Sequence, residues 1–102
     1  MSDINLAWMA GLFEGEGYIR KHKGRGIGIN MTDLDILERF QAFAAVGTIR
    51  PKKVAEPHHK PAWEWAIYKN AEVYRLLELM LPYFGERRAF TALNRLDIID
   101  CC

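Results

Sequence analysis

A short stretch of strict alternation, over residues 62–69, constrains the fold of this chain more than any other feature. A period of two places alternate side chains on opposite faces of a β-strand. One face here is apolar, with Trp63, Trp65 and Ile67, and the other is mixed, with Glu64, Ala66 and Tyr68. Such a strand is half-buried and is typical of an antiparallel sheet that is covered on one face only.

The other elements follow from periodicity and from residues that begin or end helices. We expect helices over 4–15, 33–45, 70–80 and 86–99, strands over 16–23, 27–31, 48–53 and 62–69, and a turn at 23–26. Asp3 and Thr32 are expected to cap the first two helices, and Gly47 to end the second. The order αββαββα plus a last helix predicts an α+β domain, a four-stranded antiparallel sheet with helices on one face. The other face must meet solvent or a partner.

The length of 102 residues favours one domain, 1–102. Half of the residues are apolar, which is enough for a core, and an oligomer would add to the surface that this small domain buries. Without a long apolar run, neither a membrane span nor a secretion signal is expected. We therefore expect a cytoplasmic protein, or one in an organelle or nucleoid. Cys101 and Cys102 are expected to be reduced, and no Cys/His spacing suits zinc.

The net charge of +1 conceals an uneven distribution of charges. Basic residues cluster in and near the expected strands: Arg20, Lys21, Lys23, Arg25, Arg50, Lys52, Lys53 and Lys60. Acidic residues concentrate in the expected helices. Basic strands on acidic helices would give one positive face, and such a face favours a nucleic acid as partner.

The first expected helix carries small residues and ends in acidic ones. Ala7, Gly11 and Gly15 are four residues apart, hence on one helix face. They could let the same helix of a second copy pack closely across a two-fold axis, or merely seat the helix on its own sheet. Glu16 stands where the first strand begins. Pairing would bring two Glu16 carboxylates together, and these repel unless a divalent cation neutralises them.

The segment from Trp8 to Gly17, WMAGLFEGEG, resembles the LAGLIDADG motif of homing endonucleases and their maturase relatives. Met9 stands for the first leucine, and Glu14 and Glu16 stand for the two aspartates. The element order also resembles that family, as do Met31-Thr32-Asp33 before the second helix and Leu81-Pro82-Tyr83-Phe84 before Arg87 and Arg88.

The resemblance implies a homodimeric, intron-associated endonuclease that cuts near-palindromic duplex DNA with Mg²⁺, or another divalent ion such as Mn²⁺ or Ca²⁺. It makes Glu16 the metal ligand, places Arg87 at a position that can clamp a phosphate, and puts Asn30 or Thr32 where a polar residue positions water. Glu14 receives a supporting role near the helix end. The expected dimer interface is Ala7, Gly11, Glu14 and Gly15.

The strand residues that alternate with the apolar set are the candidates for DNA binding. They are Tyr18, Arg20, His22, Asn30, Thr48, Arg50, Lys52, Glu64 and Tyr68, with Lys23, Arg25, Lys53 and Lys60 better placed for phosphates. By the groups that bases present, arginine suits guanine, asparagine suits adenine, and Glu64 can accept from cytosine N4.

Two other functions stay open at this stage. The same fold could bind DNA or RNA without cleaving it, as a maturase or regulator, because glutamate replaces aspartate at position 16 and no glutamine ends the second strand. The chain could also be a small interaction protein that binds no nucleic acid.

Overall fold

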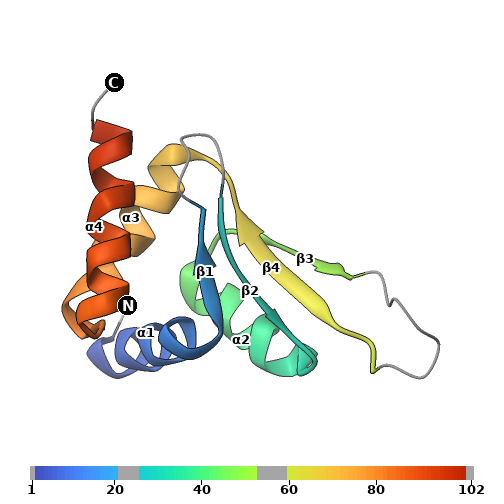
Figure 1. The fold of residues 1–102 in the computed structure, drawn as a ribbon. Coiled ribbons are helices and arrows are strands. Elements are labelled where there is room, and N and C mark those ends of the chain that lie inside the picture. Colours follow the sequence, from blue (N-terminus) through green and yellow to red (C-terminus); the bar gives the residue numbers. More distant parts are fainter. Residues whose placement is uncertain (1, 21–25, 53–59, 101–102) are drawn as a thin grey trace.

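The computed structural model describes residues 2–20, 26–52 and 60–100. The elements follow the predicted order (Figure 1): α1 (Asp3–Glu16), β1 (Gly17–Ile19), β2 (Ile27–Met31), α2 (Leu34–Ala44), β3 (Thr48–Pro51), β4 (Trp63–Ile67), α3 (Asn70–Met80), the short 3-10 helix η1 (Leu81–Tyr83) and α4 (Glu86–Asp100). The prediction of an α+β fold is confirmed.

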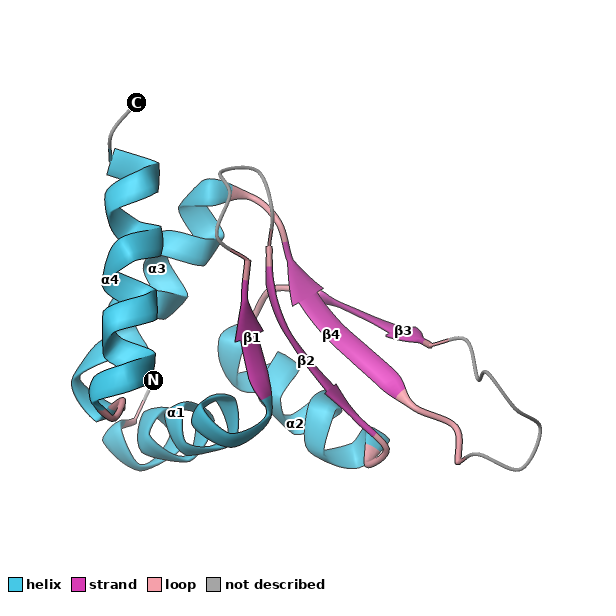
Figure 2. Cartoon of the chain, in the orientation of Figure 1, coloured by secondary structure: helices cyan, strands magenta, loops and turns pink. Residues whose placement is uncertain are grey.

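The four strands form one antiparallel sheet in the order β1-β2-β4-β3, so that β2 and β4 are central. The register pairs Tyr18 with Gly28, Gly28 with Ala66, and Ala66 with Thr48. The helices gather on one side of the sheet, and within the described part of the chain no helix covers the other side (Figure 2). We call that uncovered side the open face.

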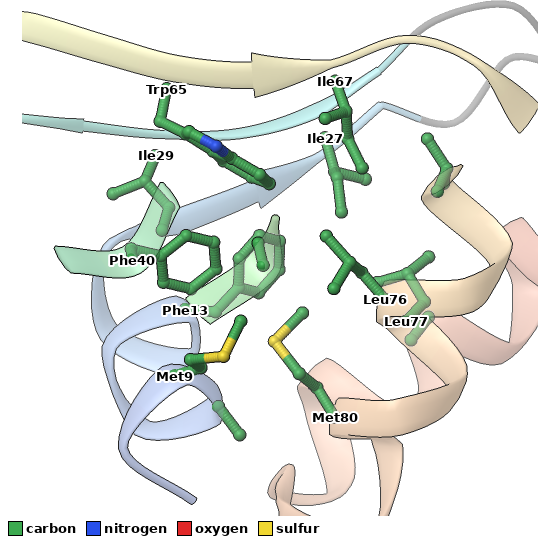
Figure 3. Packing of buried hydrophobic residues seen from close by; sticks show 14 of the residues in the cluster. Met9, Phe13, Ile27, Ile29, Phe40, Trp65, Ile67, Leu76, Leu77 and Met80 are labelled. Carbon is green, nitrogen blue, oxygen red and sulfur yellow. The ribbon is translucent and has the colours of Figure 1, made fainter. Parts of the chain in front are cut away.

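The core lies between the sheet and the helices. Trp65 of β4 is fully buried, and its ring meets that of Phe40 of α2 edge-on, with centroids 4.7 Å apart. Figure 3 shows the side chains that surround them, which come from both central strands and from α1 and α3: Met9, Phe13, Ile27, Ile29, Ile67, Leu76, Leu77 and Met80. The predicted inward direction of the apolar residues of β4 is thus confirmed, and Ile27 and Ile29 of β2 point the same way.

Among the described residues, the strands are shorter than the sequence suggested. Strand β1 spans Gly17–Ile19, Glu16 belongs to α1, and residues 21–23 of the expected strand lie outside the described residues. Arg20 adds one hydrogen bond after β1, from its backbone N–H to the carbonyl of Gly26 (3.1 Å). The third and fourth end their pairing at Pro51 and Trp63. Proline has no N–H to continue a ladder, and among the described residues one backbone bond follows, from Lys52 N to Ala62 O (2.8 Å).

Three expected helix ends were wrong by one or two residues. Ser2, not Asp3, caps α1, because its hydroxyl accepts a hydrogen bond from the backbone N–H of Asn5 (3.1 Å). The residue at the cap position of α2 is Asp33 rather than Thr32, without a side-chain cap bond. Helix α2 ends at Ala44 rather than near Gly47, and Ala45 caps it in the left-handed conformation (φ 62°).

Gly47 has a different role from the one expected. Its φ of 104° is a conformation that side chains with a Cβ rarely adopt, and a Cβ there would overlap the indole of Trp65. The Trp65 indole Nε1 donates to the carbonyl of Val46 (3.0 Å), so this loop is packed tightly on the core.

We expect Gly47→Ala to lower the free energy of unfolding by about 1–3 kcal/mol, because it adds backbone strain and an overlap with Trp65. Urea denaturation at one protein concentration measures this. Ala45→Gly is the matched control, since relief of its left-handed strain offsets the added entropy of the unfolded chain to within about 0.5 kcal/mol. Equal losses in both variants would contradict the assignment.

Candidate nucleic-acid interface and catalytic residues

The open face carries the strand residues that the alternation predicted to point away from the core. Its described members are Tyr18, Arg20, Gly28, Asn30, Thr48, Arg50, Lys52, Glu64, Ala66 and Tyr68. Three of these are cations and one is an acid, which gives the face a net positive charge. His22, Lys23, Arg25 and Lys53 lie outside the described residues.

One row of polar residues crosses the sheet on this face. The pairing places Asn30 of β2 opposite Glu64 of β4, and Glu64 opposite Arg50 of β3. Glu16 lies at the β1 end of the row, because it precedes Gly17, whose partner is Ile29. The Oδ1 atom of Asn30 is buried, and no hydrogen-bond partner for it is found in the described part of the chain.

Tyr18 and Glu64 form a pair that sequence reasoning missed. The Tyr18 hydroxyl donates to Glu64 Oε2 (2.8 Å), and the Arg20 guanidinium lies 5.1 Å from the centre of the tyrosine ring. Burial and the hydrogen bond to Glu64 raise the pKa of the Tyr18 hydroxyl, so it remains a protonated donor. Both residues were expected on this face, but 46 positions separate them and no local signal links them.

Helix α1 has two different sides. Met9, Ala10 and Phe13 are fully buried in the core. The small residues Ala7, Gly11 and Gly15 are exposed, and an added Cβ at either glycine would find no atom within 4 Å. The alternative that these residues seat the helix on its own sheet is therefore wrong. We call Ala7, Gly11 and Gly15 the small-residue face.

Glu14 does not belong to that face, contrary to expectation. Its carboxylate accepts a hydrogen bond from the backbone N–H of Gly85 (2.7 Å), at the start of α4, and pairs with Arg88 (3.4 Å). Arg88 also donates to the Glu14 carbonyl (3.1 Å). Through these contacts the Glu14 side chain packs against its own chain, away from the expected dimer interface, and links the end of α1 to the start of α4.

Glu16, at the end of α1, and Arg87, at the start of α4, remain exposed. The carboxylate of Glu16 is a hard oxygen donor and fits Mg²⁺ chemically. The described residues contain no group of three or more His, Cys, Asp or Glu residues that could hold a metal ion. A divalent ion would therefore need further oxygen ligands, which a second copy or a DNA phosphate can provide.

A family model described as a LAGLIDADG-like domain matches residues 3–80. This chain belongs to the LAGLIDADG family. The match covers α1, the whole sheet, α2 and α3, and so includes the motif that the sequence suggested.

Solved structures show the same fold for this LAGLIDADG chain. The homing endonuclease I-CvuI in complex with a DNA target is 21% identical, with a TM-score of 0.74 over 95% of this chain and 66% of that one. The intron-encoded I-CeuI with DNA gives 12% and 0.76, over 97% and 55%. The archaeal I-Vdi141I with DNA gives 16% and 0.69, over 96% and 68%. This chain thus spans from about half to two thirds of these proteins.

A search of curated proteins gives no match. Among the residues that the structure describes, no helix combines the length and the apolar character needed to cross a bilayer.

We expect Glu14→Ala to lower the free energy of unfolding by about 1–2 kcal/mol, because the Gly85 N–H and Arg88 lose their partner. Hydrogen exchange should quicken in the first turn of α4. Glu16→Ala, two residues away and exposed, serves as the control and should change stability by less than about 0.5 kcal/mol. The reverse ranking would show that the two glutamates have been assigned the wrong roles.

Proposed function

We propose that two copies of this chain pair through α1 and form a divalent-metal-dependent endonuclease that cuts both strands of a near-palindromic DNA site. The observation that carries this proposal is the exposed small-residue face on a helix whose end bears Glu16. A helix that is apolar on both sides is usually buried on both sides.

The small-residue face suits a second copy of the same helix. Glycine and alanine let two helix backbones approach closely, and a two-fold axis makes each surface its own partner. Ile4, which is 82% exposed, extends the face by one turn towards the N-terminus. The pairing would cover apolar surface that the single domain leaves in water.

Pairing also supports the chemistry. The helix ends would bring two Glu16 side chains together, and their mutual repulsion favours a bound divalent cation. Such an ion activates water and stabilises the leaving oxygen in phosphodiester hydrolysis. Arg87 would hold a phosphate oxygen, since its guanidinium is always protonated and cannot act as a base. Asn30 stays our prediction for the residue that orients water.

The open face is the surface we assign to DNA. Its strands present Arg20, Arg50 and Lys52 in an otherwise polar surface, a composition that suits phosphates and base edges. Strands of a sheet can enter the major groove and contact base edges there. I-CvuI and I-CeuI, which share the fold, were solved in complex with DNA, and this supports DNA as the kind of partner.

A second candidate function is DNA binding without cleavage. Each chain supplies one Glu16 carboxylate to the proposed metal site. If the two Glu16 side chains of a dimer were misplaced, metal binding would be lost while the open face stayed intact. The glutamate at position 16, one methylene longer than aspartate, makes such a misplacement easier. Cleavage and binding must therefore be measured separately.

The first test concerns pairing. The wild-type chain should have twice the mass of one chain at micromolar concentration in light scattering. Gly11→Leu should be a folded monomer or an aggregate, because leucine has room in the single chain but not between two close helices. Glu38→Leu, exposed on α2, is the control for an added surface leucine and should stay dimeric. A wild-type monomer would remove the shared active site.

The second test concerns cleavage. The substrate is a supercoiled plasmid carrying the duplex that the wild-type protein selects from a random library in Ca²⁺. With Mg²⁺ or Mn²⁺ the wild type should linearise it, whereas Glu16→Gln should bind with unchanged affinity and cut at least about 100-fold more slowly, because a metal ligand is lost. Wild-type binding without cutting would establish the second candidate function instead.

A further inference from the structure

Glu64 is the one acidic side chain that the described strand residues carry on the open face, since Glu16, at the end of the same row, belongs to α1. Glu64 lies between Asn30 and Arg50 in a surface that otherwise carries cations. On a surface that binds a polyanion, a carboxylate weakens the attraction to phosphates. Glu64 contributes favourably to DNA binding only where a base presents a hydrogen-bond donor to it, so its position indicates which base it faces.

The carboxylate is fixed by Tyr18 from across a strand. The Tyr18 side chain extends from β1 across Gly28 of β2 and reaches Glu64 on β4. A Cβ at Gly28 would lie 2.5 Å from the tyrosine hydroxyl oxygen. Gly28 and Ala66 are buried although they belong to the open face, which shows how closely they are covered. The absence of a side chain at position 28 is what lets Tyr18 cross.

Tyr18 provides a hydrogen-bond donor to one oxygen of Glu64, so that Arg50 is not needed for that role and can bind DNA. Oε2 accepts the tyrosine hydrogen bond, and no bond to Oε1 is found among the residues that the structure describes, so Oε1 can accept from a DNA base. Arg50 is the cross-strand partner of Glu64, yet the ion pairs found among the described residues do not include one between them. The row therefore presents an acceptor and a multiple donor side by side, about one strand spacing apart.

In the major groove this pattern matches one base pair best. Cytosine presents the N4 amino group, and its partner guanine presents the acceptors O6 and N7 beside it. Adenine also has an amino group, but its N7 acceptor lies next to N6 and would face the carboxylate. Guanine and thymine oppose Glu64 with acceptors, which leaves a desolvated carboxylate unpaired and so disfavours them.

We propose that Glu64, positioned by Tyr18 and flanked by Arg50, recognises a C·G base pair in each half of the DNA target, with cytosine at Glu64 and guanine at Arg50. This inference rests on the proposed DNA-binding function. Tyr18 is a positioning residue in it, and Glu64 is the residue that determines the base.

The test is selection of binding sites from a random duplex library in Ca²⁺, followed by competition among four duplexes that differ at one position per half-site. Wild type should prefer cytosine there by about fivefold or more over each other base. Glu64→Gln keeps an acceptor for Tyr18 and should shift the preference to adenine, whose N6 and N7 suit an amide. Other positions should keep their bases.

Tyr18→Phe is the matched variant for positioning. It keeps the ring over Gly28 and beside Arg20 but removes the hydroxyl, so Glu64 can swing to Arg50. The preference for cytosine should fall by about threefold or more at that one position, at a mid-range salt concentration where total binding is still strong. Glu38→Gln, on the exposed surface of α2, is the control and should leave all base frequencies unchanged.

The outcomes separate the two proposals. If the wild-type protein binds no duplex, the proposed function fails and this inference fails with it. If it selects a site but Glu64→Gln leaves every base frequency unchanged, DNA binding stands and the assignment of Glu64 is overturned. If Glu64→Gln acts and Tyr18→Phe does not, Glu64 determines the base and the positioning role of Tyr18 is rejected. Unchanged far-UV circular dichroism establishes that each variant is folded.

Discussion

The burial of Trp65 is the constraint on which the rest of this structure depends. The indole fills the centre of the core against Phe40, and its nitrogen is bound to the loop after α2. Since a strand alternates, the direction of this one side chain places Glu64 and Ala66 on the open face. A slip of one residue in β4 would invert them all, so the hydrophobic core determines which residues are offered to a partner.

Helix α1 combines two requirements in fourteen residues. One side supplies Met9 and Phe13 to the core, and the other carries small residues that have nothing packed on them. The contacts of Glu14 with α4 then fix the end of the helix, where Glu16 stands. The helix thus sets the position of the candidate catalytic group through bonds that do not involve that group itself.

The sequence allowed the architecture to be predicted because its signals are local. A period of two gave Trp63, Trp65 and Ile67 as the inward residues of β4, helical and strand periods gave the order of elements, and the motif gave the family. What could not be predicted depends on groups far apart. The pairing of Tyr18 with Glu64 requires the strand order, and the contact of Glu14 with Gly85 requires the path of the whole chain. Helix caps failed for a different reason: adjacent polar residues, such as Ser2 and Asp3, compete for the same role.

The bond from Gly85 to Glu14 has a consequence for the order of folding. It joins residues 71 positions apart, so forming it costs the entropy of closing a long loop of chain. During synthesis the first helix emerges early, but its acidic end gains an anchor only after the start of the last helix has left the ribosome. A partly made chain therefore contains α1 without the anchored helix end that a cutting enzyme would need. The candidate catalytic end of α1 becomes fixed only when α4 has also been made.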